Sequence, residues 1–244
     1  MKPTLFISDL HLSATRPRIN QLFLDFLQDT ASHARALYVL GDLFEYWPGD
    51  DDLTEPLHAG IAAALRRLHE AGVAVYFMHG NRDFLVGEEF AAASGATLLP
   101  DPTLIDLCGR PTLLMHGDSL CIDDPAYMAF RAKVRNPDWQ REFLAKPLAG
   151  RKAIIEGLRR ESNEEKTLKS AGIMDINQDA LAAVLREHNY PRLIHGHTHR
   201  PARHTLSIDG STCERWVLTD WYEHGGYLRC DHAGCEAVAI APPR

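Results

Sequence analysis

The amino-acid sequence predicts an α/β fold, in which strands form a sheet packed by helices. Short apolar, β-branched runs alternate with amphipathic helical patterns along most of the chain. Polar residues follow five of the predicted strands directly, so the strand ends are also the candidate functional positions. One long stretch, residues 123–175, contains no clear strand and interrupts the alternation.

Apolar spacing defines each element. Residues 19–27 place their apolar side chains on one helical face, and residues 57–68 do the same before Gly72 ends the helix. The last two alternating runs predict a pair of antiparallel strands. In chain order, the predicted elements are strand 3–8, helix 19–27, strand 36–41, helix 57–68, strands 73–78 and 112–116, helix 181–185, strand 192–195, and strands 205–209 and 215–220.

The interrupting stretch predicts the domain organisation. It is rich in Arg, Lys and Glu and carries apolar residues at helical spacing, among them Tyr127 and Phe130. These two aromatic residues either pack within the stretch or line a groove. We expect residues 1–122 and 176–244 to form the core domain, and residues 123–175 to form a helical insertion that caps it.

Composition bounds the possible partners. The chain has 244 residues, enough for one large domain or one domain with an insertion, and a net charge of −7. Nucleic acid is therefore disfavoured, because phosphate backbones require a basic surface. No apolar run approaches the ~18 residues of a membrane span, and no signal peptide is evident, so we expect a cytoplasmic protein. We also expect a monomer, although the sequence leaves the oligomeric state open. The five cysteines have no CxxC spacing, and we expect reduced, packed thiols.

The polar strand ends predict a metal site. The carboxyl ends of strands are where open α/β sheets bind ligands. Carboxylate, amide and imidazole ligands without thiolate suit Mn, Fe or Zn, and one carboxylate such as Asp42 can bridge two ions roughly 3.5–4 Å apart. Gly41, Gly80 and Gly196 would allow the backbone to approach closely. The candidate ligands are Asp9, His11, Asp42, Asn81, His116, His197 and His199.

Local spacing supports this prediction. Asp9 and His11 are two residues apart, as are His197 and His199, and on extended backbone such pairs point to the same side. Each motif alone would be an ordinary turn or a solvated loop. Five such polar motifs follow predicted strands, around Asp9, Asp42, Asn81, His116 and His197. Together, in this order, they indicate a two-metal centre.

The motifs DLH, GDLFE, GNRD, HGD and GHTH resemble the five blocks of the calcineurin-like metallophosphoesterases, over residues 5–199. The resemblance implies a sandwich of two sheets flanked by helices. It implies two metal ions, with Mn²⁺ favoured and Mg, Fe or Zn left open. By the same resemblance, Asp42 bridges a first ion held by Asp9, His11 and His199 and a second ion held by Asn81, His116 and His197.

The segments GNRDFLVG, HGDSLCIDD, IMDINQ and HGHTHRP more closely resemble the UDP-2,3-diacylglucosamine diphosphatases of lipid A biosynthesis. The resemblance implies attack of a metal-bound hydroxide on the α-phosphorus, giving UMP and 2,3-diacylglucosamine 1-phosphate. It also implies peripheral contact with the cytoplasmic face of the inner membrane. The implied substrate contacts are Asn81, Arg82, Asp124, Ser162, Lys166, Lys169 and His197.

Arg82 departs from the superfamily pattern, in which a histidine usually follows the Asn of GN. Arginine is no general acid at neutral pH, but it can hold phosphate oxygens with two hydrogen bonds. We expect Asn81, Arg82 and His197 to be the catalytic side chains that stabilise charge on the phosphoryl oxygens. The alternatives are a general dimetal phosphodiesterase or nucleotide phosphatase, and a non-catalytic binding module, which the full ligand set disfavours.

Overall fold

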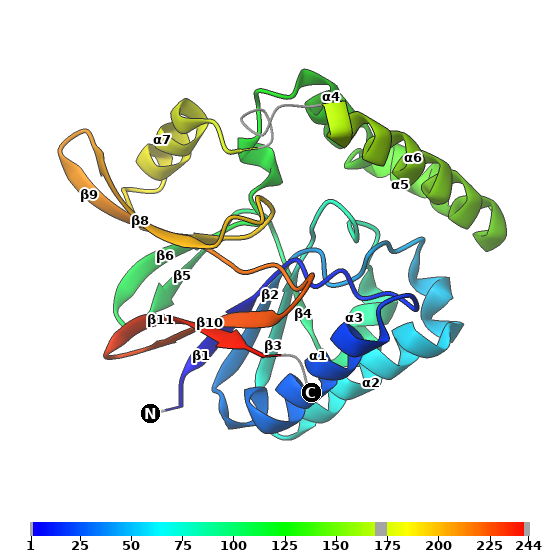
Figure 1. Ribbon diagram of the computed structural model, residues 1–244, viewed down its shortest axis with the longest axis horizontal. Helices are drawn as coiled ribbons and strands as arrows, with labels where there is room; N and C mark the ends of the chain where they lie inside the picture. The colour runs from blue at the N-terminus through cyan, green and yellow to red at the C-terminus, as the bar shows by residue number, and fades with distance from the viewer. Residues whose placement is uncertain (1, 169–174, 242–244) are drawn as a thin grey trace.

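Two β-sheets pack face to face, and helices cover both outer faces (Figure 1). The computed structural model describes the backbone of residues 2–168 and 175–241, and the side chains of residues 2–160 and 175–241. The sandwich of two sheets flanked by helices that the sequence motifs imply is confirmed.

The first sheet has six strands in the order β11-β10-β1-β2-β3-β4. Its strands β1 to β4 run parallel, whereas β10 pairs with β1 in the antiparallel sense. Parallel neighbours bring the carboxyl ends of β1, β2 and β3 to the same edge. The bounds are β1 (Thr4–Ile7), β2 (Ala36–Leu40), β3 (Ala74–Met78), β4 (Thr97–Leu99), β10 (Gly225–Asp231) and β11 (Gly234–Ile240).

The second sheet has five strands in the order β5-β6-β7-β9-β8. Its central strands β6, β7 and β9 are parallel, and a hairpin joins β8 to β9. The strand ends after β6 and β7 therefore also lie side by side. The bounds are β5 (Thr103–Leu107), β6 (Arg110–Leu114), β7 (Arg192–His195), β8 (Ala202–Ile208) and β9 (Ser211–Val217).

The helices form three groups. Helices α1 (Pro17–Asp29), α2 (Pro56–Glu70) and α3 (Glu88–Ser94) flank the first sheet, and α7 (Gln178–Glu187) packs on the second. Helices α4 (Pro125–Val134), α5 (Pro137–Leu144) and α6 (Leu148–Leu168) lie together beyond the sheet edges (Figure 1). No helix in the described part of the chain is long and apolar enough to cross a membrane.

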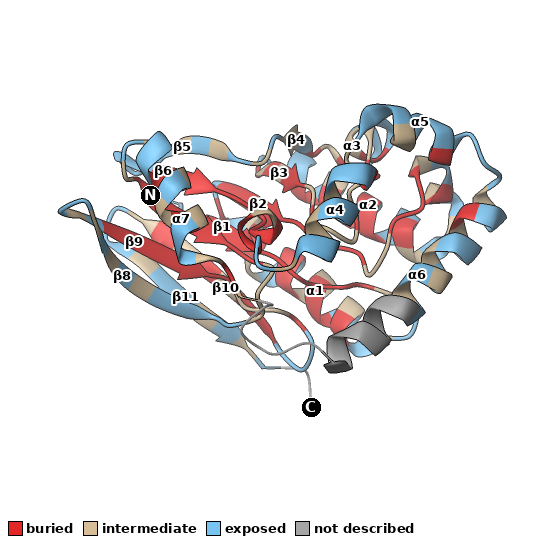
Figure 2. Ribbon diagram, turned by 90° about the horizontal axis from the view of Figure 1, so that it is seen from above, coloured by how far each residue is buried: buried red, intermediate tan, exposed pale blue. Residues whose placement is uncertain are grey.

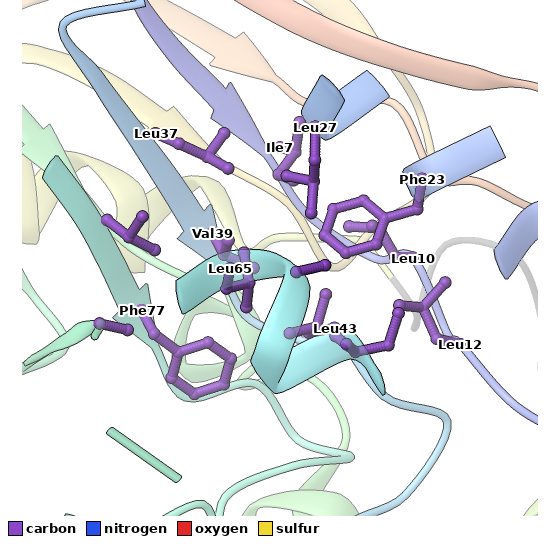
Figure 3. Packing of buried hydrophobic residues seen from close by; sticks show 14 of the residues in the cluster. Ile7, Leu10, Leu12, Phe23, Leu27, Leu37, Val39, Leu43, Leu65 and Phe77 are labelled. Atoms are coloured by element: carbon purple, nitrogen blue, oxygen red, sulfur yellow. The ribbon is translucent and has the colours of Figure 1, made fainter. Parts of the chain in front are cut away.

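The apolar core has three layers, which match the layers of the fold. The largest lies between the first sheet and its helices, where Ile7, Phe23 and Phe77 are completely or almost completely buried (Figure 3). The layer between the sheets includes Phe6 and Trp216, and the third joins the second sheet to α7. Buried residues run through the centres of both sheets, whereas the outer strands, α4, α5 and the described side chains of α6 are largely exposed or half-buried (Figure 2).

The sequence identified seven of the strands but missed four. Strand β4 has only three residues, β5 alternates weakly, and β10 opens with Gly225 and Gly226, which carry no strand signal. The prediction that every cysteine is reduced is also wrong in β10 and β11. Cys230 and Cys235 face each other across the hairpin and form a disulfide, while Cys108, Cys121 and Cys213 are free.

Close backbone approach at Gly41 holds the strand ends together. Gly41 has φ +88°, and a Cβ there would lie 2.4 Å from His116 Nδ1 and 2.6 Å from the Cα of Gly80. Only glycine meets both the left-handed conformation and the contact. The close approach that we expected at Gly41, Gly80 and Gly196 is confirmed.

We predict that Gly41→Ala destabilises the fold more than Gly210→Ala. Gly210 has a similar φ of +79° but no atom within 4 Å of the added Cβ. Both substitutions incur a backbone penalty on the order of 1 kcal/mol, and Gly41→Ala adds about 1–3 kcal/mol of steric strain. Urea denaturation followed by circular dichroism measures the difference, and equal losses would show that the packed contact is unimportant.

Leu185 tests how much α7 contributes to the second sheet. The side chain is completely buried in the third core layer, so Leu185→Ala should lower the free energy of unfolding by about 2–5 kcal/mol. The matched control is Leu104→Ala, because Leu104 is 51% exposed and its truncation should change stability by less than about 0.5 kcal/mol. Similar losses in the two variants would contradict this account of the core.

Candidate metal centre

The polar strand ends of both sheets meet at one place. Asp9 and His11 follow β1, Asp42 follows β2, and Asn81 follows β3. The second sheet supplies His116 after β6, and His197 and His199 after β7. All seven predicted ligands are therefore brought together, and their metal-binding roles remain a proposal.

Asp9, His11 and His199 form one group of possible ligands. His199 Nε2 lies 3.3 Å from Asp9 Oδ1 and 3.4 Å from His11 Nε2. Their ligand atoms all lie within 4.8 Å of one another. Two imidazole nitrogens and a carboxylate oxygen converge on one point, which suits a divalent ion of the first transition series.

Asp42 lies between the two halves of the centre. Its Oδ2 is 3.9 Å from His11 Nε2, and its Oδ1 is 3.8 Å from His116 Nε2. One carboxylate thus presents a different oxygen to each side, as a bridging ligand does. Asp9, Asp42 and His116 also satisfy the 4.8 Å grouping of ligand atoms.

Asn81 joins the remaining two histidines. Its Oδ1 lies 3.1 Å from His116 Nε2 and 2.9 Å from His197 Nδ1. His116 donates its other ring nitrogen to the Leu40 carbonyl at 2.9 Å, which aims Nε2 into the centre. The amide oxygen and two imidazoles can hold a second ion beside Asp42.

The backbone of the ligand loops corrects one expectation. We expected Asp9 and His11, and likewise His197 and His199, to project together from extended backbone. Their φ values are instead +56°, +51°, +68° and +52°, all left-handed. Such values are uncommon for residues other than glycine and cluster at functional sites. The side chains converge because the backbone turns through left-handed conformations after each strand. The alternation of side chains along an extended strand is not the cause.

Asp83 organises the loop around Asp42. Its buried carboxylate accepts hydrogen bonds from the backbone N–H groups of Asp42, Leu43, Phe44 and Gly80, at 2.7–3.4 Å. Asp83 is the last residue of the GNRD motif, and nothing in the sequence pattern distinguishes its role from that of its neighbours. This acceptor fixes two ligand loops to each other.

The shifted pKa values of two histidines reflect the negative charge of the centre. Burial alone would lower the pKa of His116, but the carboxylates of Asp42 and Asp9 outweigh it and raise the pKa to about 9. Burial and the charge on His116 lower the pKa of His197 to about 4. The buried acids thus favour positive charge on neighbouring imidazoles, and divalent ions would supply the same compensating charge.

Glu45 was missed as a functional residue. Its Oε2 lies 3.3 Å from His11 Nδ1, and its Oε1 accepts a hydrogen bond from Arg159 of α6 at 2.5 Å. Burial opposes the charge, yet the contact with His11 and the nearby arginines lower the pKa of Glu45 to about 2. The acid in GDLFE was the available signal, because a carboxylate commonly orients a metal-ligating histidine.

Helix α4 is tied to the same centre. Arg131 Nε and Tyr127 Oη each donate to Asp118 Oδ2 at 2.8 Å, and Asp118 is completely buried just after His116. Arg135 donates to the Gly80 carbonyl at 2.9 Å. The Tyr127 ring also stacks on His197 at a centroid distance of 6.1 Å. Helix α4 is therefore attached directly to the loops that carry His116 and Asn81.

One large pocket of about 600 Å³ opens at the centre. Its inner wall contains His11, Asp42, Asn81 and His197, and its outer part is apolar. We call this the main pocket. The apolar wall consists of Trp47, Phe84, Leu85, Phe130, Val134, Trp139, Phe143, Ile155 and Leu158.

The predicted substrate contacts divide into two groups. Asn81, Arg82, Asp124 and His197 line the main pocket. Arg82 donates its backbone N–H to Asp42 at 2.8 Å, and Asp124 also caps α4 by accepting from the Tyr127 N–H. The other predicted contacts lie outside the described side chains, and they are Ser162, Lys166 and Lys169.

Sequence comparisons agree with this geometry. Residues 2–201 match the family model described as calcineurin-like phosphoesterase. A protein of Aromatoleum aromaticum named UDP-2,3-diacylglucosamine hydrolase is 55% identical over 230 residues, 94% of both chains. Proteins with the same name from Cellvibrio japonicus and Serratia proteamaculans are 52% and 51% identical. The match with the Cellvibrio japonicus protein covers 95% of this chain and 96% of that protein. The match with the Serratia proteamaculans protein covers 96% of this chain and 98% of that protein.

The family match and the named relatives confirm the resemblance that the sequence motifs indicated. The family and the clustered candidate ligands together support a dimetal centre. The chain is a hydrolase and belongs to the calcineurin-like phosphoesterase family.

Proposed function

We propose that the chain hydrolyses the pyrophosphate bond of UDP-2,3-diacylglucosamine and serves lipid A biosynthesis. The products are UMP and 2,3-diacylglucosamine 1-phosphate. The observation that carries this proposal is the main pocket, in which five of the seven candidate metal ligands, namely His11, Asp42, Asn81, His197 and His199, share one lining with a long apolar wall. The names of the relatives, which match almost the whole chain, support the same substrate.

We propose that the centre holds two Mn²⁺ ions through the seven predicted ligands. Asp9, His11 and His199 would hold one, Asn81, His116 and His197 the other, and Asp42 would bridge them. When bound, such ions lower the pKa of a coordinated water towards 7 and so supply the nucleophile for the α-phosphorus. Mn²⁺ is favoured by the family resemblance, and the oxygen and nitrogen ligands also suit Fe or Zn.

The protein's own side chains would orient the pyrophosphate. Arg82 lines the main pocket next to the centre, where its guanidinium can hold two phosphoryl oxygens at once. Asn81 and His197 are held together by a 2.9 Å contact and face the same space. Charge that develops on the oxygens would meet these prearranged groups. The leaving sugar phosphate needs little protonation, which suits a site with arginine in place of histidine.

The apolar wall would hold the acyl chains. Trp139 and Phe143 stack at 4.8 Å, and Phe84 lies 6.4 Å from Trp139 between ring centroids. Each CH₂ group buried there contributes about 0.8 kcal/mol. The sequence offered Tyr127 and Phe130 as residues that could line a groove. Tyr127 contacts Asp118 and His197, so Phe130 is the better candidate for lipid contact.

The insertion would act as the lipid-facing part of the molecule. We propose that residues 123–175 form a cap on a core made of 1–122 and 176–244. Leu144 and Ile154 of this cap are 41% and 40% exposed. Together with the basic residues of α6, they would support peripheral contact with anionic lipid at the cytoplasmic face of the inner membrane. Ser162, Lys166 and Lys169 would add substrate contacts from α6 and beyond it, and the protein would act as a monomer.

We predict that purified protein with Mn²⁺ releases UMP from UDP-2,3-diacylglucosamine, and that Asn81→Ala or chelation by EDTA abolishes the release. Asn81 contacts both His116 and His197, so its loss removes a ligand while the buried core stays intact. Far-UV circular dichroism checks that the variant folds. Cleavage of simple diesters without UMP release would favour the general phosphodiesterase.

We predict that Leu158→Asp raises the KM for the acylated substrate by about tenfold or more, because the carboxylate would lie in the apolar wall. Its effect on bis(p-nitrophenyl) phosphate should be small, since that diester has no acyl chain. Ile154→Asp is the matched control on the same helix, because the two side chains are 39% and 40% exposed but only Leu158 lines the pocket. Equal effects of the two variants, assayed in detergent micelles, would contradict the acyl assignment.

A further inference from the structure

A second, smaller pocket adjoins the main pocket beside the candidate metal centre. Its volume is about 250 Å³, and its lining includes Asp175, Thr198, Arg200, His204 and Arg215. We call it the Arg215 pocket. Thr198 and Arg200 line both this pocket and the main pocket, and Thr198 separates the candidate ligands His197 and His199. A molecule bound at the centre can therefore extend into it.

Arg215 is the unusual group in this pocket. It is only 7% exposed, and its Nε and Nη1 make no hydrogen bond among the described residues. It shares the outer face of β9 with Cys213, because strand side chains alternate. Burial lowers the pKa of Arg215, and Asp175 only partly offsets this effect. Arginine cannot lose its proton in a protein, so these buried donors leave a strong demand for an acceptor.

The neighbouring charges select the kind of ligand. Among the described residues that line the pocket, Asp175 is the only acid, and it is already paired with Arg200. His204 borders the pocket with a lowered pKa, caused by burial and by the charge of Arg215. The lining therefore combines the donors of Arg200 and Arg215 with the hydroxyl of Thr198, and it suits a group rich in carbonyl, hydroxyl or other acceptor oxygens. Its volume is below the ~300–1,000 Å³ of sites for whole drug-sized ligands, so it would take one part of a larger molecule.

We propose that the Arg215 pocket binds the nucleoside half of the substrate, with the guanidinium of Arg215 donating to the carbonyl oxygens of the pyrimidine base. This inference rests on the proposed function, which places the acylated sugar along the apolar wall of the main pocket. The other half of a nucleotide sugar carries the base and the ribose, whose oxygens match the unsatisfied donors. The pyrophosphate would then lie at the metal centre, between the two pockets.

Arg215→Met tests the proposal because it keeps the length of the side chain and removes the donors. The KM for UDP-2,3-diacylglucosamine and the inhibition constant of UMP should each rise by about tenfold or more, as expected for a lost charge-assisted hydrogen bond. Hydrolysis of bis(p-nitrophenyl) phosphate and inhibition by ribose 5-phosphate should not change, because neither compound carries the base. Arg203→Met is the matched control, since Arg203 is an exposed neighbour that pairs with Glu214 and does not line the pocket.

The results of these assays distinguish a failure of the proposed hydrolysis from a failure of the proposed base-binding role of Arg215. If the wild-type protein releases no UMP, the proposed function fails and this inference fails with it. If the wild type is active and Arg215→Met leaves both constants unchanged, or weakens UMP and ribose 5-phosphate equally, only the base-binding role is overturned. Should Arg215→Met not fold, a crystal of the wild-type protein with 5-bromo-UMP decides. Anomalous density for bromine in the Arg215 pocket supports the proposal, and bromine located elsewhere contradicts it.

Discussion

Two buried carboxylates, those of Asp9 and Asp42, impose the constraint on which the site depends. They are 0% and 1% exposed, and the ion-pair partners that the described residues give them are histidines. Buried charges persist in proteins when they are paired or bind metal ions. The same two carboxylates raise the pKa of the buried His116 to about 9, which reflects this concentration of negative charge. A two-metal centre removes the excess and also explains why so many neutral nitrogen and oxygen donors surround it.

The same constraint accounts for the surrounding architecture. Ligands from five loops can meet only if the loops approach closely, which requires glycine at positions such as 41 and 80 and a common acceptor in Asp83. Helix α4 then attaches to these loops through Asp118 and Gly80. The apolar wall of the main pocket is thereby held beside the candidate ligands. Thr198 and Arg200 line both the main pocket and the Arg215 pocket, so the proposed substrate would extend from one pocket into the other with its pyrophosphate at the centre.

The sequence predicted the parts of the structure that depend on local periodicity and strand order. It identified the central strands and all seven candidate ligands, because parallel strands bring their carboxyl ends together whatever the loop geometry is. It missed β10 and β11, whose glycines carry no strand signal, and it missed the disulfide, because the pairing of Cys230 with Cys235 depends on hairpin register. Glu45 and Arg215 were also missed, since their roles depend on contacts or unmet donors that appear only after folding.

The central claim is that Asp42 bridges two metal ions. A crystal grown with Mn²⁺ and measured above and below the manganese absorption edge tests it directly. We expect two anomalous peaks about 3.5–4 Å apart on either side of the Asp42 carboxylate. One should lie among Asp9, His11 and His199, and the other among Asn81, His116 and His197. A single peak, or peaks that do not contact Asp42, would contradict the account.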